Sequence, residues 1–153
     1  MVEIKTAYSE LKKKYKDLPS FEDLDNEFEI SGVEDNFILR GIRRKCVEKV
    51  EFFAKIVEDL LQPDANLTNM YECRDFGDGE KENIYNLFKR LMFFSRSAAE
   101  VALKSDDKED ARFLSVFFNS WMDLKPDLMV IVSKITDSWE RDTEFKEDLE
   151  YFG

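Results

Sequence analysis

A single apolar stripe near the end of the sequence limits what this chain can fold into more than any other feature. Its residues recur at three- and four-residue steps from Phe113 to Trp139, the spacing of one face of an α-helix. The stripe keeps its helical phase through Pro126, which lies opposite the apolar face. We therefore predict one helix over 106–141, capped by Ser105 and kinked near Pro126, with two separate helices as the alternative. The stripe consists of Phe113, Leu114, Phe117, Trp121, Leu124, Leu128, Ile131, Val132, Ile135 and Trp139.

Two more segments carry the helical spacing. The apolar residues of 32–61 and of 79–104 each recur on one face, which predicts two further long amphipathic helices. Ser31 and Glu34 form a capping-box pattern at the start of the first helix. Asp78 is expected to cap the second.

Two shorter amphipathic segments, 3–17 and 20–28, come before the long ones. At ~1.5 Å per residue the helix over 106–141 is ~50 Å long, and we expect the two short helices to dock where it overhangs its ~40–45 Å neighbours. The predicted fold is all-α, an antiparallel helical bundle of three long helices with the short N-terminal helices packed on it. Residues 1–141 are expected to form one domain, followed by an acidic-aromatic C-terminal tail over 142–153.

The composition favours a helical protein in the cytoplasm. The chain has 43% hydrophobic residues but few helix breakers, with five Gly and three Pro. No apolar run approaches the ~18 residues that cross a bilayer, so we expect no membrane partner. The two cysteines do not make a disulfide framework, and no apolar leader opens the chain, which together predict a reducing, cytoplasmic location.

The chain is strongly acidic. Its formal net charge is −11, and residues 19–36 hold seven acidic residues and no basic one. This charge opposes direct binding of nucleic acid, because such binding depends on Lys and Arg that replace the counterions of the phosphates. It favours a protein partner with a basic surface, or alternatively the mimicry of nucleic acid by an acidic inhibitor.

One charged side chain, Arg43, falls in the middle of the apolar arc of the helix over 32–61. Because arginine is almost never buried without a partner, this position indicates either a core ion pair or the floor of an anion site. Asp110 falls on the apolar face of its own helix, at a level that counting from the helix ends places across from Arg43. We predict that Arg43 and Asp110 form a structural ion pair in the core.

The sequence has no His, the side chain on which most general acid/base and much metal chemistry depends. Two acidic pairs, Glu48-Lys-Val-Glu51 and Glu72-Cys-Arg-Asp75, resemble the ExxE and ExxD pairs by which all-α nucleotide pyrophosphohydrolases of the MazG type hold Mg²⁺. This resemblance covers those four acids and implies a Mg-dependent enzyme if the pairs converge. Glu48, however, falls on the polar arc of its helix, so we expect no metal site that joins the four.

Exposed aromatic residues are the candidate contact points. Phe52 and Phe93 fall on the outer faces of their helices among charged neighbours, and paired exposed aromatics can mark a contact surface. The tail 142–153 combines five acids and one Lys with large apolar residues, which is typical of a short docking peptide or of a last turn that covers the bundle. Its large apolar residues are Phe145, Leu149, Tyr151 and Phe152.

These patterns favour a non-catalytic helical protein-protein interaction module, an adaptor or a regulator. Its partner is expected to be another protein with a basic surface. The alternatives are an acidic nucleic-acid mimic that inhibits a nucleic-acid-binding enzyme, and the Mg-dependent pyrophosphohydrolase. No catalytic residue, cofactor or metal ligand is predicted, and the oligomeric state stays open.

Overall fold

The computed structural model describes residues 3–34, 36–64 and 66–141, and every regular element within these ranges is helical. No helix there combines the length and the apolar composition that crossing a membrane requires. The all-α fold is therefore confirmed. In chain order the elements are α1 (Ile4–Lys14), α2 (Phe21–Phe28), the 3₁₀ turn η1 (Ile30–Gly32), α3 (Ile38–Leu61), α4 (Leu67–Cys73), α5 (Asp78–Lys104) and α6 (Asp107–Arg141).

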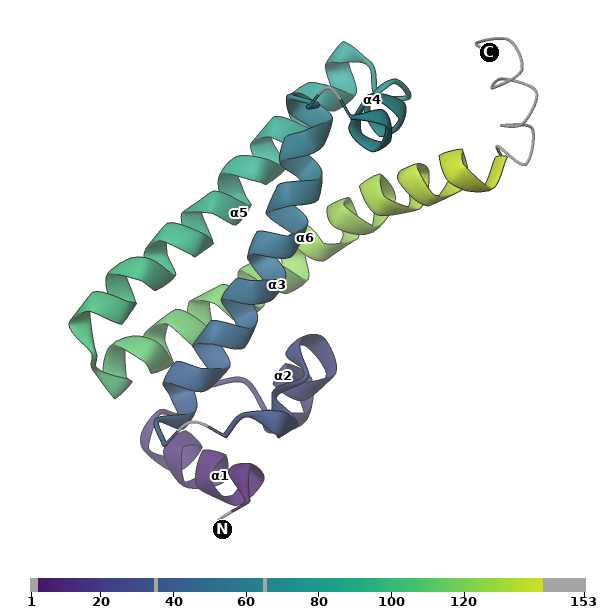
Figure 1. The fold of residues 1–153 in the computed structure, drawn as a ribbon. Helices are drawn as coiled ribbons and strands as arrows, with labels where there is room; N and C mark the ends of the chain where they lie inside the picture. The colour runs from purple at the N-terminus through teal and green to yellow at the C-terminus, as the bar shows by residue number, and fades with distance from the viewer. Residues whose placement is uncertain (1–2, 35, 65, 142–153) are drawn as a thin grey trace, which may run out of the picture.

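The three long helices share one core and cross one another (Figure 1). α3 and α5 pack side by side and run in opposite directions, whereas α6 crosses α3. α5 and α6 are joined by a tight turn and diverge from it, so the C-terminal half of α6 runs away from α5 and toward α4 (Figure 1). This divergence opens the surface between α5 and α6.

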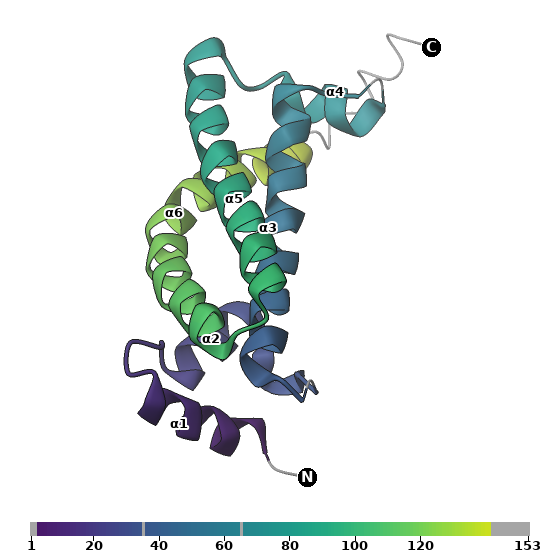
Figure 2. The same ribbon diagram turned by 90° about the vertical axis from the view of Figure 1, so that its left-hand side faces the viewer.

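α6 is one continuous helix through Pro126, as the phase of the apolar stripe predicts. Its axis bends in the middle of the helix (Figure 2). A proline inside a helix lacks the N–H that would bond to the carbonyl four residues earlier, here Met122, and this loss lets a helix bend. The bend allows both halves of α6 to bury their apolar face.

The start of α3 differs from the sequence prediction. The helix begins at Ile38 with Phe37 as its N-cap, so the capping box expected from Ser31 is wrong. The Ser31 N–H instead donates to Asp25 Oδ1 at 2.8 Å, and the neighbouring Ile30 is fully buried. These contacts fold the segment into the 3₁₀ turn η1, which ends at Gly32 and is followed by Val33 in an extended conformation.

The turn between α5 and α6 also differs from the prediction. Ser105 adopts the left-handed conformation (φ 51°) and closes α5, with its N–H donating to the Val101 carbonyl at 3.3 Å. Asp106, not Ser105, caps α6, because its Oδ1 accepts from the Lys108 N–H at 3.1 Å. One residue therefore ends the first helix and the next residue begins the second.

An aromatic cluster holds α2, α5 and α6 together. The Phe117 ring lies 5.1–5.5 Å from the rings of Phe28, Phe94 and Phe113, measured between ring centroids, and 6.1 Å from Trp121. Both Phe117 and Trp121 are buried. The core is thus centred on the middle of α6, where all three helices contribute aromatic side chains.

The short helices α1 and α2 pack at the N-terminal end of α3 (Figure 1). Their predicted position on the overhanging end of α6 is wrong, because Phe28 of α2 packs against the middle of α6, on Trp121. α4 lies at the C-terminal end of α6 instead. The Tyr71 ring of α4 stacks on Trp139 with centroids 4.1 Å apart.

The structure brings Arg43 and Asp110 together inside the bundle. The Arg43 Nη1 group donates to Asp110 Oδ1, and the residues are only 4% and 1% exposed. Burial raises the pKa of the Asp110 carboxyl, and the adjacent guanidinium opposes that rise. The pair joins the first half of α3 to the first turn of α6.

A second charged network fastens α2 to α6. Glu27 accepts hydrogen bonds from Trp121 Nε1 at 2.9 Å and from Lys125 Nζ at 2.6 Å. Partial burial alone would raise the pKa of this carboxyl, but the two hydrogen bonds together with the charges of Lys125 and Lys49 outweigh burial and hold the pKa below its usual value of 4.5. Folding therefore favours the ionised form of Glu27.

This network predicts a loss of stability in acid. A carboxyl whose pKa is lower in the folded state stabilises the fold above its unfolded pKa, and this contribution disappears as the pH falls through the folded pKa. We expect Glu27→Gln to cost about 1–3 kcal/mol at neutral pH, and the cost should shrink as the pH falls through the lowered folded pKa of Glu27 and the parent side chain loses its charge. Urea unfolding of both proteins across this range measures the difference, and the exposed Glu48→Gln variant is the control. A cost of Glu27→Gln that stays constant with pH would contradict the assignment.

Candidate functional site

A groove runs between α5 and α6 where the two helices diverge. Its wider part is a hollow of about 470 Å³, to which α3 contributes no residue. We call it the wide hollow. It is lined by Phe76, Glu80, Asn83, Ile84, Asn86, Leu87, Arg90, Asp127, Val130, Ile131 and Lys134.

A second hollow of about 190 Å³ lies between the same two helices, nearer to the turn that joins them. We call it the narrow hollow. The buried rings of Phe94, Phe113 and Phe117 contribute to its surface, so it opens directly onto the aromatic cluster of the core. Its lining residues are Phe93, Phe94, Ser97, Glu100, Val101, Glu109, Arg112, Phe113, Val116 and Phe117.

The two hollows lie on one continuous face. On α5 the lining residues follow one another at three- and four-residue steps, so they share one side of the helix. Between the hollows, Arg90 Nη2 donates to Asp123 Oδ2 at 2.9 Å and bridges the two helices. We call the whole surface the α5–α6 groove. The series on α5 is Asn83, Leu87, Arg90, Phe94, Ser97 and Val101.

Large apolar side chains stand exposed on the walls of the groove. Phe93 is 64% exposed, Val130 is 69% exposed, and Val116 is also exposed. The floor beneath them is buried and apolar, with Leu87 in the wide hollow and Phe117 in the narrow one. Apolar walls over an apolar floor give the groove a surface that gains free energy when it is covered.

The basic residues of the groove are each paired with a carboxylate of this chain. Besides the Arg90 bridge, Lys134 contacts Glu80 at 2.6 Å and Arg112 contacts Glu109 at 3.8 Å.

Two carboxylates of the groove, by contrast, have no ion-pair partner among the residues that the structure describes. Asp127 belongs to the wide hollow and Glu100 to the narrow one. Glu109 is contacted by Lys104 at 3.7 Å as well as by Arg112. Each hollow therefore keeps one carboxylate, Asp127 or Glu100, without an ion pair among the described residues.

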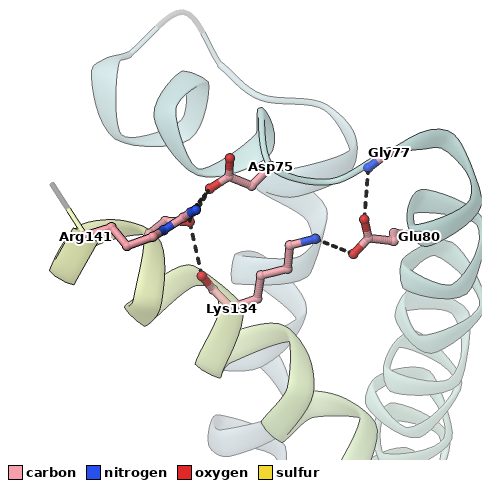
Figure 3. Close-up of polar contacts among 6 residues, drawn as sticks. Asp75, Gly77, Glu80, Lys134 and Arg141 are labelled. Carbon is pink, nitrogen blue, oxygen red and sulfur yellow. Dashed lines mark hydrogen bonds and ion pairs between the residues drawn. The ribbon is translucent and has the colours of Figure 1, made fainter. Parts of the chain in front are cut away.

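A polar cluster closes the end of the groove near α4 (Figure 3). Asp75 accepts hydrogen bonds from the Ser138 hydroxyl and, at 3.0 Å, from Arg141 Nη2. The Ser138 hydrogen bond first, and then the charge of Arg141, hold the pKa of Asp75 below its usual value despite partial burial. Beside it, Glu80 accepts from the Gly77 N–H at 3.3 Å and from Lys134 (Figure 3).

The same cluster fixes the last turns of α6 against α4. The Tyr71 hydroxyl donates to the Ser138 carbonyl at 2.6 Å, and Trp139 Nε1 donates to Glu72 Oε2 at 2.9 Å. Together with the stacking of Tyr71 on Trp139, these contacts fasten the C-terminal half of α6 to α4, and the Lys134–Glu80 ion pair joins the same half of α6 to α5 across the wide hollow. The wide hollow is thus bounded by specific contacts at its far end.

The predicted contact residues fall in different places. Phe93 lies in the α5–α6 groove, where its ring packs edge-on against Phe94. Phe52 is 63% exposed on α3 and packs in the same way against Phe53, but it lines neither hollow. The tail residues lie outside the described part of the chain; they are Phe145, Leu149, Tyr151 and Phe152.

The acids of the MazG-like pattern do not come together. Glu48 is exposed on α3, whereas Glu51 accepts from the Ser95 hydroxyl of α5 at 3.3 Å. Glu72 and Asp75 bind the end of α6. Over the described ranges no group of three or more Asp, Glu or Cys side chains is placed to hold a metal ion. The geometry gives the resemblance no support.

The sequence interpretation did not find the α5–α6 groove. Val116 and Val130 are apolar but fall outside the main stripe of α6. Their position off the stripe is the sequence feature that could have indicated the groove. Apolar residues away from the core-facing stripe of an amphipathic helix are candidates for a contact surface.

The fold and the groove define the class of this protein, an all-α protein with an open groove between two of its long helices. No protein-family model, no curated protein and no solved structure matches the chain.

Proposed function

We propose that this chain is a non-catalytic protein-interaction module, an adaptor or a regulator that binds another protein along the α5–α6 groove. The observation that supports the proposal is the groove itself, with exposed Phe93, Val116 and Val130 standing over a buried apolar floor. Large apolar side chains grouped along one groove are typical of a surface that another macromolecule covers.

The charge of the groove supports a protein partner rather than nucleic acid. Its unneutralised carboxylates, Glu100 and Asp127, would repel phosphates, and the whole chain carries −11. A partner with a basic surface complements this charge and gains association rate from it. The acidic-mimic hypothesis remains the alternative, and it rests on the net charge of −11 rather than on the groove.

The proposal is tested by finding the partner and reconstituting the complex. Proteins captured by the parent chain from its native source are identified, and each candidate is purified and titrated against parent, Phe93→Ser and Phe52→Ser. Both phenylalanines are exposed and both pack on a neighbouring phenylalanine, so the two variants are matched. We expect Phe93→Ser to weaken binding about tenfold or more and Phe52→Ser to change it little. Equal binding by all three proteins would show that the groove is not the contact surface.

The tail gives a separate prediction. Removal of residues 142–153 should leave the melting temperature within a few degrees of the parent, because the contacts of Tyr71, Ser138 and Arg141 that fasten α6 precede the cut. The same removal should abolish or strongly weaken partner binding if Phe145 and its apolar neighbours in the tail dock on the partner. Thermal unfolding and a binding titration measure the two effects. A large loss of stability with binding intact would show that the tail is part of the fold.

A further inference from the structure

We infer that the α5–α6 groove binds a basic amphipathic α-helix of another protein, about 18–20 residues long, in two anchor positions. This inference rests on the proposed function, and it names the kind of segment that the groove takes. Shape, backbone chemistry and charge each support it.

The length of the groove matches a helix. From Asn83 to Val101 the lining series on α5 spans ~27 Å at 1.5 Å per residue. A partner helix of about 18 residues has the same length. Such a helix would lie along both α5 and α6 and cover the wide and the narrow hollow at once.

The walls of the groove also select a helix over an extended strand. Both walls are α-helices, whose backbone N–H and C=O groups, apart from the Met122 carbonyl that Pro126 leaves without an N–H, bond within the helix. An extended peptide would find no row of backbone partners here, and its own peptide groups would lose water without compensation. A helix brings its backbone hydrogen bonds with it and presents only side chains.

The two hollows predict the spacing of the anchor residues. Their lining on α5 runs over residues 80–90 and 93–101, so their middles lie about 12 residues or ~18 Å apart. Apolar clusters about three turns apart on the partner helix would therefore fill both hollows. The wide hollow has more than twice the volume of the narrow one and accepts the larger cluster. Between the clusters, a polar side chain would face the Arg90–Asp123 bridge.

The charge of the groove predicts basic residues beside both anchors. Glu100 in the narrow hollow and Asp127 in the wide hollow carry charge that no described residue neutralises by an ion pair. Lys or Arg on the partner helix, one near each anchor, would meet these carboxylates. A second copy of this chain, or its own tail with five acids and one Lys, would instead bring negative charge to a negative groove.

The inference is tested with three synthetic peptides of about 20 residues. The first has Leu clusters three turns apart and Lys elsewhere, the second has the same composition in scrambled order, and the third replaces each Lys by Glu. Fluorescence anisotropy at physiological salt measures binding, and circular dichroism measures the helix content of the complex. We expect the first peptide to bind about tenfold tighter than either other peptide and to become helical on binding.

Two variants locate the binding site. Val130→Lys puts a charge on the wall of the wide hollow, whereas Met129→Lys puts the same charge on an exposed neighbour that lines neither hollow. Because both parent side chains are exposed, at 69% and 58%, neither change should unfold the protein, which thermal unfolding checks. Val130→Lys should lower the affinity for the first peptide about tenfold, and Met129→Lys should lower it much less. Glu100→Gln should also weaken binding and reduce its salt dependence.

Each contrary outcome overturns the inference in a recognisable way. If the ordered and scrambled peptides bind equally well, or if Val130→Lys and Met129→Lys lose the same affinity for the first peptide, then net charge alone attracts the peptide. Dimerisation that Val130→Lys abolishes would mean that a second copy fills the groove. If binding of a purified partner requires Phe93 but uses a non-helical segment of that partner, this inference is wrong and the proposed function is still supported. If helical peptides bind the groove but no purified partner requires the groove for binding, the proposed function is wrong.

Discussion

Replacement of Arg43 by methionine should destabilise the protein by about 3–5 kcal/mol, because it leaves the Asp110 carboxylate buried without its partner. Methionine keeps an unbranched apolar chain in the place of the arginine stem, so the loss reports the charge more than the volume. Urea unfolding at neutral pH measures it. The effect is expected to be large because Asp110 is 1% exposed and water cannot replace the guanidinium.

The double replacement Arg43→Met with Asp110→Met separates the charge from the packing. When both charges are gone, no buried ion is left alone, and the double variant should lose much less stability than the single one. The difference between the single and double variants isolates the cost of the orphaned carboxylate. Equal destabilisation by both would contradict a buried pair whose members depend on each other.

Replacement of Phe117 by alanine should cost about 3–5 kcal/mol, the range for large-to-small changes at fully buried aromatic positions. The Phe117 ring contacts rings from α2, α5 and α6, so its removal opens a cavity where three helices meet. Phe117 also contributes to the narrow hollow. Partner binding should therefore weaken together with stability.

Phe52→Ala is the matched control for this prediction. The same side chain is removed, but from a position that is 63% exposed and that contacts Phe53 on one side only. Its cost should stay near or below about 1 kcal/mol in the same urea titration. Comparable losses from Phe117→Ala and Phe52→Ala would show that the aromatic cluster is not the centre of the core.

The positions of α5 and α6 were predictable because helical periodicity is a local property. α5 and α6 begin and end within one residue of their predicted bounds, and α6 passes through Pro126 as its apolar phase indicates. The ion pair of Arg43 with Asp110 was also within reach of the sequence. A charged residue in an apolar arc demands a partner, and few acids fall on an apolar face at the matching level.

Predictions of helix ends from local sequence patterns were wrong where a tertiary contact decided the conformation. The sequence pattern predicts a capping box at Ser31. In the structure the Ser31 N–H donates to Asp25 instead, and the buried side chain of Ile30 holds the turn in place. Ser105 was expected to begin α6, yet the tight reversal between α5 and α6 requires a left-handed residue, and Ser105 takes that conformation. In both cases the register of a helix end was decided by what lies next to it in space.

The sequence by itself determined the helical class, the lengths of α5 and α6, and which face of each long helix is apolar, because these depend on residues a few positions apart. It also determined the net charge of −11. Only the tertiary structure decided the α5–α6 groove. The groove depends on the angle at which two helices diverge, and the stacking of Tyr71 on Trp139 and the contact of Asp75 with Arg141 hold that angle. These residues are more than sixty positions apart in the chain, so no local pattern could bring them together.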